Sequence, residues 1–344
     1  MSQTLPTHYS ICPLLVASNI AVELGWLDEE YQRVGAEAIY LRSLPDNQGW
    51  LPHFTHGESR LIRDGGAVPA LWARADQADT LLVATTASQR AGQILVRADG
   101  RIRQVADLFG KRIGVPVSRN TARVDVLKAL AEHGLFNALQ LAGLEPSQVR
   151  LIELEDEGDP HTLQPAARPS AFWAQLHGLH GKPGQEVRAL AEGRVEAVHI
   201  AAGHVPALLA SGEFTVIEDL ERYPDWTLKN HNGPYATTVN RAFAEQHPQV
   251  VVAFLRAAIR AGRWINQHRE AAAEVFTRVT FLPDAGFIRQ AIAELDFVPQ
   301  LGPQNLAALE LKKDFLVQRG FLQNDFSVHE WARPDFLAQA HAGL

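Results

Sequence analysis

The sequence predicts an α/β protein whose chain forms two domains or one large one. Short segments rich in Val, Ile and Leu alternate with segments whose apolar residues recur at helical spacing, which indicates strands alternating with helices. Strands joined by helices run in one direction, so this alternation implies parallel sheets covered on their faces. A length of 344 residues, 46% of them hydrophobic, is enough to bury a sizeable core.

The predicted strands are short apolar segments, most of which a helical pattern follows. The first, "HYSI", ends directly before Cys12, and the last, "YATTVN", precedes the long helical part of the chain. In chain order the strands are expected at 8–11, 36–41, 80–86, 93–97, 112–117, 149–155, 195–200, 214–220 and 235–240.

The predicted helices include 125–135, which carries a glycine near its end, and 185–195. A long helix is expected at 248–276, because Pro248 occupies a position suited to the first helical residue. The last fifty residues also have helical patterns and are expected to wrap one domain. Residues 155–184 are rich in Pro, Gly and His, which predicts a long loop or insertion that borders the functional site.

Composition excludes several classes of function. The formal net charge is −7 and the pI about 6.1, and Lys and Arg are scattered, so no basic surface for nucleic acid is expected. A single cysteine cannot form an internal disulfide, which fits a reducing cytosol. The N-terminus lacks the features of an export signal, and no segment reaches the roughly eighteen apolar residues of a membrane span. A cytoplasmic protein without membrane insertion is therefore expected.

The cysteine, Cys12, stands between a predicted strand and "PLLVASNIAVELGWL", whose apolar residues have helical spacing. Proline is favoured at the first helical position, so this pattern predicts a helix that begins at Pro13 with Cys12 as its N-cap. Ligands of open α/β sheets bind beyond the carboxyl ends of strands, and a helix N-terminus stabilises a thiolate or a bound anion. The alternative is that Cys12 is a small buried hydrophobic residue, as lone cysteines commonly are.

A second candidate region is "PHFTHGESRLIRDGGAVPAL" at 52–71. Asp64, Gly65 and Gly66 resemble a turn before a helix N-terminus, whose N–H groups can approach an oxyanion, and Arg63 adds a planar charged fork. The alternative is a solvated arginine beside an ordinary turn. His53 lies three residues before another histidine, but no third ligand with recognisable spacing accompanies them, so no metal site is expected.

A third candidate region follows the predicted strand 112–117. Ser118, Arg119, Asn120 and Thr121 precede a predicted helix, which they could cap, or they could contact a ligand from the second domain. The chain contains no G-x-G-x-x-G, Walker or G-x-S-x-G motif, so nucleotide binding and α/β-hydrolase chemistry are not expected.

Three longer patterns in the chain are "ASNIAVELGWLDEEYQRVGAEAIYL", "DLFGKRIGVPVSRNTARVDVLKALAEHGL" and "RALAEGRVEAVHI". Together they resemble the two-lobed substrate-binding proteins of nitrate, sulfonate and taurine transport. This resemblance implies the type II periplasmic-binding-protein fold, with a ligand cleft between its lobes.

More specific motifs are "YSICP", "HFT", an arginine ten positions after that histidine, the glycine pair, and "EWARPDFL". Through these motifs the chain resembles, within that fold, the hydroxybiphenyl sulfinate desulfinase family from about Tyr9 to Leu337. The resemblance implies a cysteine-dependent C–S hydrolase that releases sulfite from an organosulfinate without a cofactor. It implies a catalytic group of Cys12, His53 and Arg63 and a backbone donor at the second glycine. The expected substrate-binding residues are Ser10, Gly65, Gly66, Ser118, Arg119 and Asn120.

The thiol could attack the sulfur of the sulfinate or protonate the carbon that bears it, and the sequence leaves both routes open. Ile11 stands where the desulfinase has a polar residue, and the segments at 118–121 and 161–184 differ from it in composition. The organic part of the substrate is therefore not fixed by the resemblance.

The expected lobes are residues 1–90 with 233–344, which carry Cys12, His53 and Arg63, and residues 91–232. The expected ligand is a small organosulfur oxyanion, and the sequence does not give the oligomeric state. An alternative function is a transporter's substrate-binding protein for sulfonate, nitrate or taurine, without catalysis. A ligand sensor built on the same fold is a further alternative.

Overall fold

The computed structural model describes residues 4–86, 91–156, 163–177, 184–229 and 233–344. By their contacts these residues form two units, the first within 1–88, 160–180 and 233–344 and the second within 89–159 and 181–232. The segment 160–180 was expected in the second lobe, but its helix α6 (Pro169–His177) packs against α1 and α11 of the first unit. The reason is that Phe172 and Trp173 are buried in the core of the first unit.

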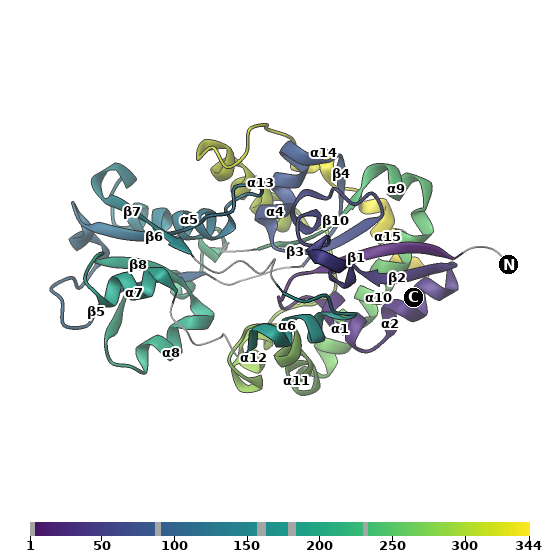
Figure 1. Cartoon of the computed structure of the whole chain (residues 1–344), viewed down its shortest axis with the longest axis horizontal. Helices are drawn as coiled ribbons and strands as arrows, with labels where there is room; N and C mark the ends of the chain where they lie inside the picture. The colour runs from purple at the N-terminus through teal and green to yellow at the C-terminus, as the bar shows by residue number, and fades with distance from the viewer. Residues whose placement is uncertain (1–3, 87–90, 157–162, 178–183, 230–232) are drawn as a thin grey trace. The chain divides into compact units, whose positions relative to one another are not determined.

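The first unit contains a five-stranded sheet in the order β2-β1-β3-β10-β4 (Figure 1). Strand β1 is parallel to β2 and β3, whereas β10 is antiparallel to β3 and β4. The strand β3 was not predicted, and it lies in the centre of the sheet. The strands are β1 Leu5–Ile11, β2 Ala36–Tyr40, β3 Leu61–Gly65, β4 Thr80–Thr86 and β10 Tyr235–Asn240.

The second unit contains a five-stranded sheet in the order β7-β6-β8-β5-β9, in which β5 is antiparallel to both of its neighbours. Both sheets are thus mixed, and the prediction of parallel sheets is wrong for β10 and β5. In the first unit, this is because the chain enters β10 from the second unit and not through a helical crossover. The strands are β5 Gly92–Arg97, β6 Arg112–Ser118, β7 Arg150–Asp156, β8 Ala197–Ala201 and β9 Phe214–Asp219.

Helices cover the first sheet. In the view of Figure 1, α4 and α13 lie on one side of β1 and β3, and α1, α2 and α10 lie on the other. The predicted helix 248–276 is two helices, because the backbone at His268 leaves the helical region with φ −131°. The helices not yet given are α1 Ala17–Glu23, α2 Trp26–Arg33, α3 Pro52–Thr55, α4 Ala67–Trp72, α9 Arg241–Gln246, α10 Pro248–Gln267, α11 Arg269–Val279, α12 Ala285–Ile292, α13 Pro303–Gln318, α14 Val328–Trp331 and α15 Pro334–Ala342.

The second unit has the helices α5 (Val126–Leu141), α7 (Gln185–Ala191) and α8 (Val205–Leu209). The glycine expected to end α5, Gly134, lies inside the helix. It is there because the His199 ring of β8 occupies the space beside it: a Cβ at residue 134 would lie 2.0 Å from His199 Nε2.

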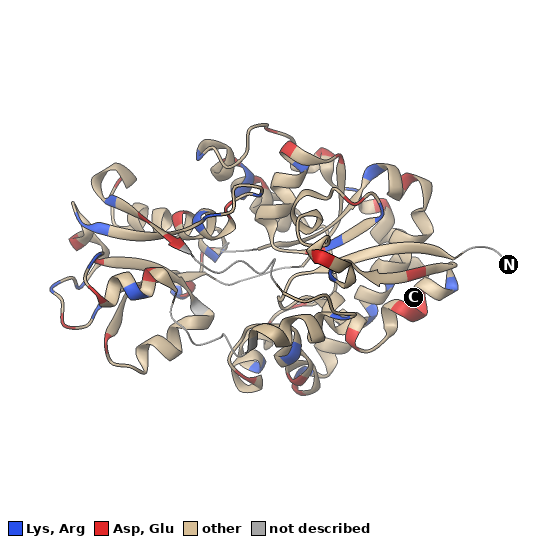
Figure 2. Ribbon diagram, in the orientation of Figure 1, with Lys and Arg blue, Asp and Glu red and all other residues tan. Residues whose placement is uncertain are grey.

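Charged residues of both signs are interspersed along the elements of both units (Figure 2). In the part of the chain that the structure describes, no helix combines the length and the apolarity needed to cross a membrane.

Candidate active site

Cys12 follows the last residue of β1, at the carboxyl end of the strand, as the sequence predicts. It does not cap a helix, however, because α1 begins at Ala17 and not at Pro13. The backbone between them forms tight turns in which Leu14 N donates to the Cys12 carbonyl. Asn19 of α1 is fully buried and donates its amide to the Cys12 and Leu14 carbonyls, each over 3.0 Å. The side chain of Asn19 therefore holds the loop that carries the Cys12 thiol in its conformation.

His53 lies on the short helix α3. Its ring contacts Ser10 of β1 and Cys12, which directly follows β1. Its Nε2 lies 3.3 Å from Cys12 Sγ, and its Nδ1 lies 2.6 Å from Ser10 Oγ. Ser10 is fully buried, and His53 is 4% exposed. These two contacts fix the plane and the direction of the imidazole ring, so that one ring nitrogen faces the thiol.

Arg63 lies in the middle of β3 and is fully buried. Its Nε donates to the His53 carbonyl over 2.9 Å, and its Nη2 lies 3.3 Å from the Gly66 carbonyl and 3.7 Å from Cys12 Sγ. Among the described residues, its Nη1 has no hydrogen-bond partner. Burial lowers the pKa of Arg63, which remains a cation. A buried cation with an unused N–H beside a thiol is suited to hold an oxyanion there.

The glycine pair joins β3 to α4. Gly65 is the last residue of β3, and Gly66 is the N-cap of α4, so the predicted junction with a helix is present. A Cβ at residue 65 would lie 2.3 Å from Cys12 Sγ and 3.3 Å from Arg63 Nη2. Gly65 is thus required by the close approach of the thiol and the guanidinium to the backbone.

Ser118, the last residue of β6, lies in the second unit together with Arg119 and Asn120, which follow the strand. The N-cap of α5 is Asp125, so these three residues do not cap that helix, and the capping interpretation is wrong. Ser118 N donates to the Asp125 carboxylate, and Arg119 forms an exposed ion pair with Glu155. Asn120 stabilises the loop through its own backbone and side chain. Their contact with a ligand stays a prediction.

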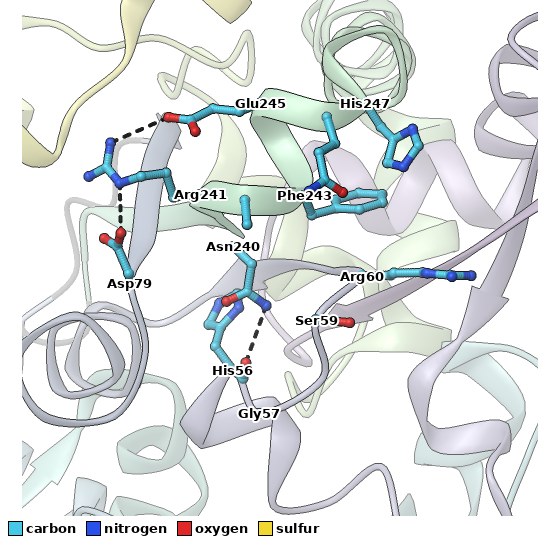
Figure 3. Close-up of a pocket in the computed structure, with 12 residues that line it drawn as sticks. His56, Gly57, Ser59, Arg60, Asp79, Asn240, Arg241, Phe243, Glu245 and His247 are labelled. Atoms are coloured by element: carbon cyan, nitrogen blue, oxygen red, sulfur yellow. Dashed lines mark hydrogen bonds and ion pairs between the residues drawn. The ribbon is translucent and has the colours of Figure 1, made fainter.

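His56 ends α3 and lies behind the candidate active site. Its Nε2 lies 2.7 Å from Thr238 Oγ1 of β10. Burial is the main cause that lowers the pKa of His56 to about 3, and the positive charge of Arg63 is a smaller cause. His56 is also one wall of a pocket of about 660 Å³ beside Asn240, Arg241 and Phe243 (Figure 3). Within the described ranges, no group of three or more His, Cys, Asp and Glu is placed to hold a metal ion.

Two buried polar residues near the thiol were not predicted: Asn19 and Asp64. Asp64 was identified only as part of a turn, although it is 3% exposed and accepts a hydrogen bond from Ser18. The sequence did hold a signal for both residues, because each is a polar residue within an apolar helical or strand pattern. A polar residue at such a position is buried only where it has a hydrogen-bond partner, which marks it as a candidate for a structural contact.

The structure therefore brings together, in the first unit, Ser10, Cys12, His53, Arg63, Gly65 and Gly66.

Comparison with known proteins shows which proteins the chain is similar to. No protein-family model matches the chain. The chain is 29% identical over 355 residues to the 2'-hydroxybiphenyl-2-sulfinate desulfinase of Rhodococcus erythropolis, which covers 96% of this chain and 92% of that protein. It is 25% identical over 244 residues to the taurine-binding periplasmic protein of Escherichia coli K12, covering 66% and 62% of the two chains. The resemblance that the motifs indicate is confirmed.

Among solved structures, the desulfurization enzyme DszB has a TM-score of 0.74 at 24% identity, covering 98% of this chain and 99% of that one. A DszB mutant in complex with biphenyl-2-sulfinic acid has a TM-score of 0.72 at 23% identity, covering 99% and 100%. The alkanesulfonate-binding protein SsuA of Xanthomonas axonopodis pv. citri bound to MOPS has a TM-score of 0.62 at 18% identity, covering 97% of this chain and 99% of that one. The predicted two-lobe type II periplasmic-binding-protein-like fold is confirmed.

Proposed function

We propose that this chain is a desulfinase that hydrolyses the C–S bond of an organic sulfinate and releases sulfite. The observation that carries the proposal is the Cys12 thiol, which lies within 3.7 Å of both the His53 ring and the Arg63 guanidinium. The similarity to a desulfinase over 96% of the chain supports the same activity. A site that only binds a sulfonate has no need of a thiol and an imidazole in contact.

The sulfinate head group would bind through charge-assisted hydrogen bonds. The free Nη1 of Arg63 would donate to one oxygen, and the Gly66 N–H is proposed as the donor to the other. This arrangement would place the sulfur and its attached carbon beside Cys12 Sγ. Because Arg63 is held by the carbonyls of His53 and Gly66, it is positioned before the substrate arrives.

The overall reaction converts the sulfinate and one water molecule into the hydrocarbon and hydrogen sulfite. In one route, the Cys12 S–H protonates the carbon as the C–S bond breaks, sulfur dioxide leaves, and water both hydrates it and restores the thiol proton. In the other route, the Cys12 thiolate attacks the sulfur, the departing carbon takes a proton, and water hydrolyses the S–S bond to release sulfite. Both routes use His53 to exchange the thiol proton.

An aromatic sulfinate is the proposed substrate. Aromatic side chains gather beside the imidazole: the Phe54 ring lies 5.1 Å from the His53 ring, and the Trp50 ring lies 5.6 Å from Phe54. Phe54 and Trp50 leave only 9% and 7% of their surface exposed. Ser118, Arg119 and Asn120 stay predicted contacts of the organic part, and a cytoplasmic location stays a prediction from the sequence.

A sulfonate-binding protein is the second candidate function, because SsuA has the same fold. The two functions differ in turnover, because a desulfinase converts a sulfinate to sulfite and a binding protein only binds its ligand. We expect the wild-type protein to release sulfite from benzenesulfinate and biphenyl-2-sulfinate, with an equal amount of benzene or biphenyl, and to leave the matching sulfonates intact. Tight binding of the sulfonates without sulfite from any aromatic or aliphatic sulfinate would favour the binding protein and contradict the desulfinase.

Ser10 is proposed as a positioning residue, since its hydroxyl contacts the imidazole and not the thiol. We expect Ser10→Ala to lower kcat by about tenfold while KM changes little, because this factor corresponds to the usual free-energy contribution of one buried hydrogen bond. Steady-state kinetics with benzenesulfinate measure both constants. Ser10→Thr, which keeps a hydroxyl, is expected to recover most of the rate. An unchanged kcat in Ser10→Ala, or equal losses in both variants, would contradict the positioning role.

A further inference from the structure

The side chain of Asn19 on α1 is a buried amide whose hydrogen bonds both go to the loop that carries the thiol. It is fully buried, and its Nδ2 donates to the carbonyls of Cys12 and Leu14, each over 3.0 Å. Among the described residues, its Oδ1 has no hydrogen-bond partner. A buried amide is costly unless it is hydrogen-bonded. The part of Asn19 that offsets this cost is therefore its pair of donors, and both act on residues 12–16, the thiol loop.

The thiol loop consists of two tight turns in succession. Leu14 N donates to the Cys12 carbonyl over 2.7 Å, and Val16 N donates to the Leu14 carbonyl over 2.9 Å. Each bond joins residues two positions apart, which defines a γ-turn. Pro13 is the central residue of the first turn, where the φ of about −65° that its ring imposes suits the inverse γ-turn. The two carbonyls that close these turns are the two that accept from Asn19.

These contacts fix the position of the sulfur. Cys12 N donates to the Asp64 carbonyl of β3 over 3.0 Å, and the Cys12 carbonyl accepts from Asn19, so the peptide groups on both sides of the Cys12 Cα are held. Only one rotatable bond determines where Sγ lies relative to that backbone. The sulfur therefore stays 3.3 Å from His53 Nε2 and 3.7 Å from Arg63 Nη2 only while both peptide groups keep their places.

We propose that Asn19 is a positioning residue, whose two amide donors hold the Cys12 thiol in contact with the His53 ring. Without these donors, the Cys12 and Leu14 carbonyls each keep one hydrogen bond, so the thiol loop stays folded, but the Cys12 peptide group can rotate. The fold should then survive while the contacts of the sulfur are lost. The proposal rests on the proposed function for its effect on turnover, and on the contacts of Cys12 alone for its effect on thiol reactivity.

The experiment replaces Asn19 in two ways and compares both variants with a matched control. Asn19→Ala removes the amide, and Asn19→Asp keeps its shape but has no donor while the introduced carboxyl is ionised. Asn266→Ala is the control, because the Asn266 side chain also ties a loop to a helix, through the Asp296 carboxylate and Phe297 N, and both of these bonds lie outside the thiol loop. The measurements are kcat and KM for sulfite release from benzenesulfinate, the rate at which iodoacetamide alkylates the single cysteine, and the midpoint of thermal unfolding.

We expect Asn19→Ala to lower kcat by about a hundredfold, the cost of displacing a reacting group by about 1 Å, while KM changes little because the groups that bind the substrate stay in place. Alkylation of Cys12 should slow by on the order of tenfold, because the thiol loses its contact with His53. Asn266→Ala should lower the unfolding midpoint without changing either rate. Unchanged rates in Asn19→Ala, or equal losses in Asn266→Ala, would overturn the proposal and leave Asn19 a structural residue.

Asn19→Asp tests whether the donors are the part of the side chain that matters. Burial raises the pKa of a carboxyl group, so the introduced carboxyl should take up a proton as the pH falls from about 8.5 to about 5.5 and then donate one of the two hydrogen bonds. Its kcat relative to the wild type should therefore recover by about tenfold over this range, while the same ratio for Asn19→Ala stays constant. A constant ratio in Asn19→Asp would overturn the proposal.

The two variants together also test the claim that the fold survives without the donors. If Asn19→Ala fails to fold, Asn19→Asp carries the test, and failure of both to fold would overturn the proposal. The alkylation rates do not depend on desulfinase activity. Slower alkylation in Asn19→Ala, with no sulfite release from the wild type, would therefore contradict the proposed function alone, whereas wild-type sulfite release with unchanged rates in the variant would contradict the positioning role alone.

Discussion

Replacement of Cys12 by serine is expected to abolish sulfite release while oxyanion binding persists. Serine is nearly isosteric, so it keeps the contacts of the loop, but its hydroxyl is a far weaker nucleophile and acid than a thiol. A loss of at least about a thousandfold in kcat is expected, in line with the removal of a catalytic nucleophile in other enzymes. The measurement is sulfite release from benzenesulfinate, with binding of benzenesulfonate followed in parallel by calorimetry.

The single cysteine supplies an independent control. Because the chain has one thiol, stoichiometric alkylation of the wild type with iodoacetamide modifies Cys12 alone, and sulfite release should fall in proportion to the label incorporated. Benzenesulfonate added beforehand should slow the alkylation. Sulfite release that survives either the serine substitution or complete alkylation would exclude Cys12 from the chemistry.

The second large effect is expected from Gly65→Ala. A Cβ at this position would lie 2.3 Å from Cys12 Sγ, 3.0 Å from Cys12 Cβ and 3.3 Å from Arg63 Nη2. The thiol must therefore move away from the backbone of β3, and the guanidinium must also shift slightly. A displacement of about 1 Å in a reacting group costs about a hundredfold in rate. We expect kcat to fall by at least about that factor, measured as sulfite release from benzenesulfinate.

Gly57→Ala is the matched control, because residue 57 is in the loop after α3 and the nearest atom to its Cβ would be the Thr55 hydroxyl at 3.2 Å. This variant should keep nearly the wild-type rate. A Gly65→Ala protein that is folded by circular dichroism and fully active would show that the thiol does not need to lie against the backbone of β3.

The local residue patterns predict the fold class and leave several features of the site open. The nine expected strands are all present, because each is an apolar segment bounded by turn signals. Cys12, His53 and Arg63 were identified as a group only through the resemblance to the desulfinase, since each residue alone has an ordinary structural explanation. Their contacts depend on the register of β1 and β3, in which Ser10 pairs with Arg63.

The missed features have physical causes. Strand β3 was not predicted because "LIRDG" contains two charged residues, which in most strands face solvent. Here both are buried, and each is stabilised by contacts from distant parts of the chain. The start of α1 was misplaced because Pro13 suits a first helical position, whereas the buried Asn19 amide binds the carbonyls that a helix from Pro13 would use.

The position of β10 has a consequence for the synthesis of the protein. Strand β3, which holds Arg63, lies between β1 and β10, and residues 235–240 of β10 are made long after residues 61–65. While the ribosome produces the second unit, β3 is an edge strand with unpaired backbone groups and a cation whose enclosure is incomplete. The backbone pairing that encloses Arg63 is therefore completed late, only after residues 235–240 have been made.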